Sequence, residues 1–493
     1  MIRLHTWVIC IGMALLSTAL LAQGAGKPRP RPQPQPAMVS AQVDISTVLG
    51  RPTATSITIN VLSAMAREGY VEYSSKPDVY EQCTPTTTFP AGTPVEITLQ
   101  NLKVDTAYTY RLCARKVGDA TFTPSDTHPF HTQRAPGSAF TFCIQGDSHP
   151  ERPQQHDPAL YAQTLLAAAA DRPDFYLTIG DDFSVDTLRE INADTVRAPY
   201  LHQRYCLSLI GQSAPLFLVN GNHEQAALCN LDGTANNVAV WAQTARNSLF
   251  PQPAPDAFYT GDVQPVEHIG LLRDYYAWTW GDALFVVIDP YWHSKSPVDN
   301  IFGSRDKGDK GNQGGKGRNL WEVTLGDAQY QWLKATLEQS TAKYKLVFAH
   351  HVMGTMRGGI DIAGLYEWGG KDRNGTDRFA EKRPTWSLPI HQLFVKTGVT
   401  IFFQGHDHLF AHQQLDGVTY QTLPEPADPN YALYFDTAYR SGEKFPNSGY
   451  VRVSVAPDKV TVAYIRQYLP NDEMANHKSG EVAFSYTVPA RKP

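Results

Sequence analysis

Five apolar runs of this 493-residue chain lead into residues that can bind metal ions. The runs span residues 140–145, 175–179, 216–219, 344–349 and 399–403. The candidate ligands that follow them are Asp147, His149, Asp181, Asn222, His350, His406 and His408. Carboxylate and imidazole groups together suit divalent zinc, manganese or iron. The pattern therefore predicts a metal centre built from several separate loops.

The spacing of the runs indicates which elements position these residues. Buried strands of an α/β sheet read as continuous apolar runs, and their carboxyl ends open onto the crevice where ligands bind. Helix-like stretches lie between the runs, at residues 158–170 and 327–339. The second stretch places Tyr330, Leu333 and Leu337 on one helical face. This alternation predicts a layered α/β domain.

Each motif is weak evidence when it stands alone. Gly-Asp-Asp and Gly-Asn-His are common turn sequences, and a single histidine after a strand is seldom a metal ligand. Here all five motifs occur in one chain, each behind a strand-like run. Glycine precedes several of the ligands, which permits sharp turns and close backbone approach. The combination, and no single motif, predicts the site.

Four further polar residues near these runs have two interpretations. Asp182 and Glu224 adjoin predicted ligands, so they either orient the histidines or lie in exposed turns. Asp289 and His293 follow another apolar run, residues 283–288. They either have a structural role or contact a substrate.

The order and spacing of the five motifs resemble the calcineurin-like metallophosphoesterase superfamily, which includes the purple acid phosphatases. The resemblance extends over roughly residues 138–470, and the segments 321–337 and 449–465 also resemble that family. It implies an α/β fold: a four-layer β-sandwich flanked by helices. It also implies a metal-dependent hydrolase of phosphate esters, with a small phosphorylated molecule as substrate.

Carried over motif by motif, the resemblance implies two metal ions that share one carboxylate. The residues are Asp147, His149 and His408 for the first ion, Asn222, His350 and His406 for the second, and Asp181 as the bridge. His223 would contact the phosphoryl group and protonate the leaving oxygen. His351 is the alternative to His350, because the proline that often follows the ligand histidine in the family is absent here.

One departure from the purple acid phosphatases concerns the metals. Those enzymes have Asp-x-Gly at the first motif and a tyrosine after the bridging aspartate, where this chain has His149 and Ser184. A purple colour and an obligatory ferric ion are therefore not expected. The two ions are expected to be iron, zinc or manganese.

Two-metal chemistry suggests the reaction. Paired cations roughly 3.5–4 Å apart clamp the attacking and leaving oxygens, and a metal-bound water loses its proton near pH 7, so the bridging hydroxide can attack phosphorus. The favoured reaction is phosphomonoester hydrolysis. A phosphodiesterase acting on nucleotides or glycerophosphodiesters is the alternative. A binding or adhesion protein with a decayed enzyme domain is disfavoured, because all seven ligand positions keep suitable residues.

The amino-terminal residues have the features of an export signal. Residues 1–26 combine a basic start, an apolar run too short to span a bilayer and small residues at the end, which predicts a signal peptide. An uncleaved anchor is the alternative. Residues 27–38 alternate proline with other residues and predict an extended linker. The mature chain is thus expected to be secreted or periplasmic, without a membrane span.

Residues 39–136 contain short alternating runs typical of an all-β domain. Residues 102–111 resemble the tyrosine corner of fibronectin type III domains, which predicts a fibronectin-III-like or Ig-like β-sandwich. A similar domain precedes the catalytic domain in purple acid phosphatases. Residues 137–493 are expected to form the catalytic domain.

Three other features bear on partners and cross-links. Cys83 with Cys113 and Cys206 with Cys229 are plausible disulfide pairs, and Cys143 is expected to be a buried small hydrophobe. The basic, glycine-rich loop 303–318 is either a surface loop or a lid over a phosphate site. A net charge of −5 gives no basic excess, so no stable nucleic-acid binding is expected.

Overall fold

The computed structural model describes residues 44–77, 79–294, 319–352 and 356–491. The predicted signal peptide, the linker and the loop 303–318 lie outside the described residues. Within the described part, no helix combines the length and the apolar character that a bilayer span requires.

The amino-terminal part is an all-β sandwich. One sheet contains β1 (Ile45–Gly50), β2 (Ile57–Ser63) and β6 (Val95–Leu99), and the other contains β3 (Arg67–Ser74), β4 (Gln82–Cys83), β5 (Thr87–Phe89), β7 (Ala107–Lys116), β8 (Thr123–Pro124) and β9 (His128–His131). Their facing side chains, among them Ile59, Val71 and Leu112, form one core. The Tyr108 hydroxyl accepts a 2.9 Å hydrogen bond from the backbone N–H of Lys103, as in a tyrosine corner.

The rest of the chain is built on two larger sheets. The first has the order β12 (Leu216–Leu218), β11 (Tyr176–Thr178), β10 (Phe140–Gln145), β23 (Gly449–Val455), β24 (Lys459–Arg466) and β25 (Val482–Pro489). The second has the order β13 (Thr260–Gly261), β16 (Tyr276–Trp280), β17 (Ala283–Val287), β18 (Tyr344–Phe348), β19 (Ile401–Gln404), β21 (Val418–Thr422), β20 (Phe410–Leu415) and β22 (Glu443–Phe445). The strands β10 to β12 are mutually parallel, and so are β17, β18, β19 and β21.

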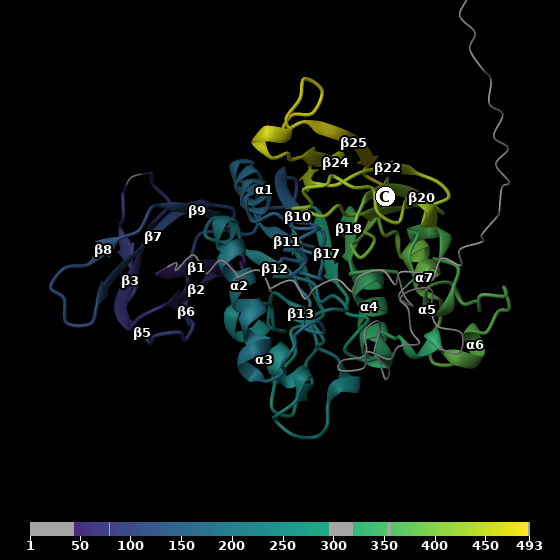
Figure 1. Cartoon of the computed structure of the whole chain (residues 1–493), viewed down its shortest axis with the longest axis horizontal. Helices are drawn as coiled ribbons and strands as arrows, with labels where there is room; N and C mark the ends of the chain where they lie inside the picture. Colours follow the sequence, from purple (N-terminus) through teal and green to yellow (C-terminus); the bar gives the residue numbers. More distant parts are fainter. Residues whose placement is uncertain (1–43, 78, 295–318, 353–355, 492–493) are drawn as a thin grey trace, which may run out of the picture.

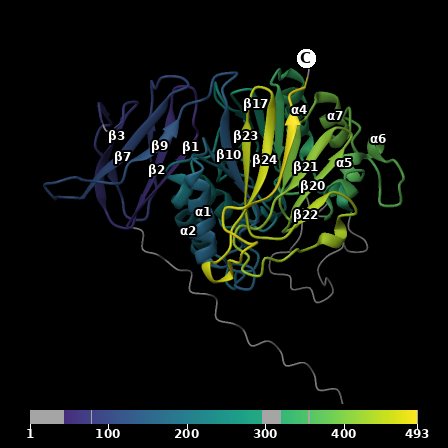
Figure 2. The ribbon, with the colours of Figure 1, turned by 90° about the horizontal axis from the view of Figure 1, so that it is seen from above.

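Helices cover the outer face of each sheet. α1 (Pro158–Ala170), α2 (Ala193–Gly211) and α3 (Val238–Leu249) pack on the first sheet, and α4 (Gly326–Gln339), α5 (Tyr366–Gly369) and α7 (Ile390–Thr397) pack on the second. The short elements are α6 (Phe379–Lys382), β14 (Pro265–Val266), β15 (Gly270–Leu271), η1 (Leu228–Asn230), η2 (Leu320–Glu322), η3 (Gly359–Asp361), η4 (Asp436–Ala438) and η5 (Pro470–Asp472). Figure 2 shows the small sandwich at one end and α5, α6 and α7 at the other.

The alternation of side chains along the strands produces the four layers. Phe142 and Ile144 of β10 face the core between the two sheets, and Cys143 between them faces the helices. The inter-sheet core is rich in aromatic rings, such as Phe142, Phe285 and Phe348. The predicted architecture, a four-layer sandwich preceded by a small all-β sandwich, is confirmed. So are the burial of Cys143 and the helix that carries Tyr330, Leu333 and Leu337.

The predicted disulfides are wrong. Neither the Cys83–Cys113 bond nor the Cys206–Cys229 bond is formed. The sheet order explains the first case, because β3 lies between β4 and β7 and pairs with both. Two strand spacings amount to about 9–10 Å. That is beyond the roughly 7 Å between Cα atoms that a disulfide can bridge.

The small sandwich packs on α2 through a buried arginine. Arg204 has 0% of its surface exposed, and its guanidinium donates to the backbone oxygens of Ser46 (3.0 Å) and Asn60 (2.8 Å) and to the Asn60 side chain (2.7 Å). Tyr110 of the sandwich donates to the backbone oxygen of Gln212 at 2.8 Å. These bonds connect the sandwich to the rest of the chain, beside which it lies in Figure 1.

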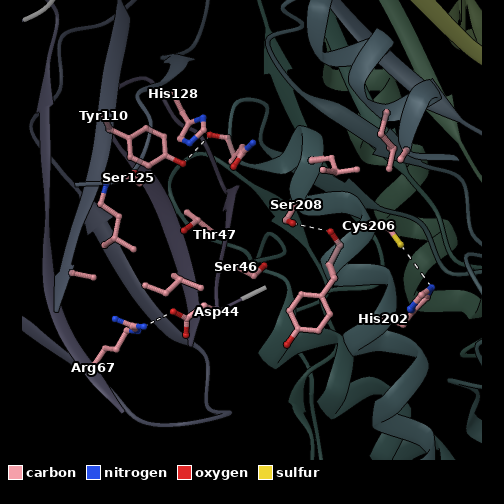
Figure 3. Close-up of a pocket in the computed structure, with 18 of the residues that line it drawn as sticks. Asp44, Ser46, Thr47, Arg67, Tyr110, Ser125, His128, His202, Cys206 and Ser208 are labelled. Carbon is pink, nitrogen blue, oxygen red and sulfur yellow. Dashed lines mark hydrogen bonds and ion pairs between the residues drawn. The ribbon is translucent and has the colours of Figure 1, made fainter. Parts of the chain in front are cut away.

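A cavity of about 740 Å³ lies beside this contact, between the sandwich and the helices α1 and α2. Figure 3 shows Tyr110 and His128 on the sandwich side, and His202 and Cys206 on the α2 side. His156 also lines the cavity, and its Nδ1 lies 2.7 Å from the backbone oxygen of Ser148. The cavity is separate from the predicted ligands, none of which lines it.

Candidate metal centre

The five predicted loops meet at one edge of the two sheets. Within each sheet the parallel strands β10, β11 and β12, and β18 and β19, place their carboxyl ends at the same edge. All seven predicted ligands are buried there: Asp147, His149, Asp181, Asn222, His350, His406 and His408. Hydrogen bonds between the loops hold them together across the two sheets. The backbone N–H of His406, for example, donates to Asp147 Oδ1 at 2.9 Å.

The first group of potential ligands is Asp147, His149 and His408. One ligand atom from each lies within 4.8 Å of the others. His408 Nε2 lies 3.2 Å from Asp147 Oδ2, and the rings of His149 and His408 have centroids 5.4 Å apart. Two imidazoles and one carboxylate therefore converge on one point.

The second group is Asp181, His350 and His406, again with ligand atoms within 4.8 Å of each other. His350 Nε2 lies 3.0 Å from Asp181 Oδ2. The same oxygen lies 3.8 Å from His149 Nε2, in the first group. Asp181 therefore stands between the groups. His351 lies outside both groups, with its Nδ1 2.9 Å from the Tyr291 hydroxyl.

The Asn222 loop packs directly against Asp181. A Cβ on Gly221 would lie 2.2 Å from both the backbone nitrogen and Oδ1 of Asp181, so only glycine permits this approach. The backbone N–H of His223 donates to Asp181 Oδ1 at 2.9 Å. The glycine before Asn222 thus allows its loop to reach Asp181.

Four of the seven residues have a left-handed backbone. The φ angles are 39° at His149, 51° at Asp181, 68° at His406 and 52° at His408. Such a conformation costs a non-glycine residue on the order of 1–3 kcal/mol, and it persists where the surroundings enforce it. It turns the chain sharply after each strand and directs these side chains into the centre.

Contacts at Nδ1 orient three of the histidines, as hydrogen bonds at His149 and His350 and as an ion-pair contact at His408. The Nδ1 atoms lie 2.9 Å from Ile179 O for His350, 2.9 Å from Glu151 Oε1 for His149, and 2.7 Å from Glu425 Oε1 for His408. In each case Nε2 is left to face the centre, an arrangement common in metal sites. Glu151 and Glu425 were not identified from the sequence, because neither is recognisable outside the folded structure.

Asp182 and Glu224 are buried and hold the loops together. Glu224 accepts from the backbone N–H groups of Asp182 and Gly221, both at 2.9 Å. Asp182 accepts from the Thr178 hydroxyl at 2.7 Å. Burial, and then the nearby carboxylates of the site, raise the pKa of Asp182 to about 7. The exposed-turn interpretation of these two residues is therefore wrong.

His223 lies beside the two groups with a carboxylate on one side and a guanidinium on the other. Its Nδ1 is 2.8 Å from Asp186 Oδ1, and its Nε2 is 3.1 Å from an Arg152 nitrogen and 3.8 Å from Asp181 Oδ2. Burial alone would lower the pKa of His223, but Asp181 and Asp186 outweigh burial and raise it. Arg152 and Asp186 were missed in the sequence because neither belongs to a strand-end motif.

The donor set fits a pair of divalent ions. Buried carboxylates and imidazoles with no cysteine suit zinc, manganese or iron. Nε2 of His149 is buried without a hydrogen-bond partner among the described residues, as expected of an atom reserved for a metal. The fold and this centre together define a metal-dependent hydrolase with its site at the ends of parallel strands.

Comparison with protein families supports this conclusion. Residues 140–410 match the family model of the calcineurin-like phosphoesterases, so the chain belongs to that family. It is a metal-dependent phosphoester hydrolase. The match covers all five ligand loops.

Solved structures show the same fold at low identity. PhoD is 14% identical, with a TM-score of 0.62 and 90% of each chain covered. The purple acid phosphatase PPD1 from yellow lupin (Lupinus luteus) seeds is 16% identical, with a TM-score of 0.56, 90% of this chain and 74% of that chain covered. No curated protein matches the sequence.

Proposed function

We propose that this enzyme hydrolyses phosphomonoesters with two metal ions that share Asp181. The supporting observation is the position of Asp181 Oδ2, 3.0 Å from His350 Nε2 and 3.8 Å from His149 Nε2. A single carboxylate oxygen thus faces imidazoles of both groups. A bridging carboxylate requires this arrangement, whereas two independent mononuclear sites would not.

The ligands divide between the two ions as the family motifs imply. The assignment is Asp147, His149 and His408 to the first ion, Asn222, His350 and His406 to the second, and Asp181 to both. When bound, such a pair makes a coordinated water acidic enough to act as nucleophile near pH 7 and neutralises the charge of the phosphate. Zinc, manganese and iron all suit this donor set.

Residues of the chain supply the remaining steps. His223 faces the centre with its Nε2, so it can give a proton to the leaving oxygen. Asp186 holds the opposite ring nitrogen at 2.8 Å and thereby fixes the orientation of the ring. The Arg152 guanidinium, 3.1 Å from the same Nε2, is placed to bind phosphoryl oxygens.

The setting we propose is outside the cytoplasm, with a small phosphorylated molecule as substrate. The signal-like residues 1–26 support export, and the net charge of −5 gives no support to nucleic-acid binding. We also interpret residues 39–136 as a fibronectin-III-like domain before a catalytic domain of residues 137–493. The contact between Tyr108 and Lys103 supports that interpretation.

Asp181→Asn tests the bridge. The change keeps the shape of the side chain but removes its charge, so hydrolysis should fall to near background and metal content should drop while the fold is retained. Asp119→Asn, in an exposed turn of the small sandwich, is the matched control and should behave as wild type. Full activity of Asp181→Asn would reject the bridging role.

Rates on a matched pair of aryl substrates test the preference for monoesters. The proposal expects the aryl phosphate monoester to be hydrolysed faster than the corresponding diester. The metal ions in the purified protein should be measured on the same sample. A diester rate far above the monoester rate would identify a phosphodiesterase instead.

A further inference from the structure

Three potential metal ligands lie together outside the proposed catalytic set. They are Asp262, Asp274 and His293, here called the accessory cluster, and one ligand atom from each lies within 4.8 Å of the other two. Both carboxylates are buried, with 5% of Asp262 and 0% of Asp274 exposed. The cluster therefore differs from a group of surface acids, which is common without any ion.

The order of β13, β16 and β17 at one edge of the larger sheet brings the three residues together. β13 and β16 are antiparallel with Gly261 opposite Tyr276. Asp262 directly follows β13, and Asp274 lies just before β16, so both occupy the same end of this pair. His293 comes from the loop after β17, the other neighbour of β16.

The imidazole of His293 is held in place by close packing. Its ring centroid lies 6.2 Å from that of Tyr275. The backbone of Gly326, with φ at +73°, approaches the ring so closely that a Cβ there would lie 3.0 Å from both Cβ and Cγ of His293. The ring is thus positioned toward the carboxylates by the backbone at the start of α4.

Asp262 Oδ1 accepts from the backbone N–H of Gln264 at 2.8 Å, but ligand atoms of the other two residues lack the partners that burial normally demands. Among the residues that the structure describes, neither carboxylate oxygen of Asp274 has a hydrogen-bond partner of normal geometry, and the same holds for Nε2 of His293. The charged groups that act most strongly on Asp274 are two further carboxylates, Asp289 and Asp262. After burial itself, these carboxylates raise the pKa of Asp274.

Two chemical solutions exist for such a site. A buried carboxylate without a partner either takes up a proton or binds a cation, because an isolated charge is strongly disfavoured away from water. A shared proton would need only the two carboxylates. The imidazole nitrogen beside them adds a third metal donor, and a nitrogen donor with carboxylate oxygens favours zinc or manganese over calcium.

We propose that Asp262, Asp274 and His293 bind a third divalent ion, zinc or manganese, which fixes the edge of the larger sheet. Three protein ligands leave one position for water, as zinc accepts. The ion has a structural role, and the cluster lies within the electrostatic reach of Asp289. That residue accepts from Asn220 Nδ2 at 2.8 Å, and Asn220 lies two residues before the proposed ligand Asn222.

Metal counting on the full chain tests the site. Wild type and Asp274→Asn are loaded with Zn²⁺ alone, freed of excess ion and analysed for zinc per chain. Wild type should hold one ion more than Asp274→Asn. Glu267→Gln is the matched control, since Glu267 lies in the same segment, is 82% exposed and loses the same charge; it should bind as wild type. Equal zinc in wild type and Asp274→Asn overturns the proposal.

The same comparison in an Asp181→Asn background separates this site from the catalytic pair. The difference of one ion should persist there even if the proposed two-metal centre is wrong. Anomalous diffraction from zinc-loaded wild-type crystals requires no variant and decides the matter if Asp274→Asn does not fold. A zinc peak among Asp262, Asp274 and His293 is expected, and a map without one overturns the proposal.

Discussion

The catalytic centre and the accessory cluster bury the same kinds of side chain but hold them differently. In the catalytic centre, hydrogen bonds to Ile179 and Glu151 and a 2.7 Å ion-pair contact with Glu425 hold three histidines at Nδ1. In the accessory cluster, both oxygens of Asp274 lack partners among the described residues. In the second site, packing against Gly326 positions His293 while Asp274 depends on its proposed ion, whereas in the first site the protein orients the histidines through polar contacts. Preorganisation of this kind is what catalysis requires.

Removal of all metal should separate the two sites most strongly. Chelation of the wild-type enzyme should lower the rate more than about a thousandfold, because the ions supply several kcal/mol of charge stabilisation. Titration with zinc, manganese or iron should restore activity. The rate on an aryl phosphate monoester is the measurement. A fully active chelated enzyme, with metal absent by elemental analysis, would refute the two-metal proposal.

His223→Ala should have the next largest effect, within the catalytic centre alone. Loss of a general acid lowers kcat by about 10²–10⁴-fold. Metal content should remain that of wild type, because His223 is assigned to proton transfer. Its control is His268→Ala, an exposed histidine that should leave kcat unchanged. Unchanged kcat for His223→Ala would show that another group protonates the leaving oxygen.

Arg152→Ala should weaken substrate binding more than metal binding. Loss of a charged hydrogen bond to phosphate costs about 1.5–3 kcal/mol, which corresponds to a KM increase of roughly 10- to 150-fold. Arg152→Lys should recover part of the loss, and Arg189→Ala, at an exposed position, should be neutral. Wild-type KM in Arg152→Ala would remove Arg152 from the phosphate site.

Asp274→Asn should affect stability and leave catalysis nearly intact. An ion at a hundred times its Kd stabilises the folded chain by about 2.7 kcal/mol. That zinc-dependent gain should shrink in Asp274→Asn, measured as the rise in Tm on adding Zn²⁺, while kcat changes little. An identical rise in both proteins would mean that zinc acts elsewhere.

The residues that the sequence singled out converge in the fold because each follows a continuous apolar strand, often after glycine. β10 and α1 have the predicted bounds, and the glycine at position 221 precedes a loop that packs on Asp181. Glu425 and Asp186 were not predicted, because their importance comes from the histidines they meet only after folding. The residues that surround Glu425 and Asp186 in the sequence form no motif that would single them out.

The accessory cluster and the cysteines show the limits of sequence patterns. Asp262 follows β13, which is only two residues long, so no long apolar run precedes Asp262 to mark it as a strand-end residue. Its proximity to Asp274 follows from the register of β13 with β16. The Cys83–Cys113 prediction failed for a related reason, because closeness in sequence does not reveal that β3 lies between the two strands.

The most direct test of the central proposal is electron paramagnetic resonance of the manganese-loaded enzyme. If Asp181 bridges two ions, wild type and Asp119→Asn should give the signal of a spin-coupled Mn²⁺ pair. Asp181→Asn should lose that signal and show isolated ions only. A wild-type spectrum of isolated Mn²⁺ ions, with two ions bound per catalytic centre, would contradict the shared carboxylate on which the proposed function rests.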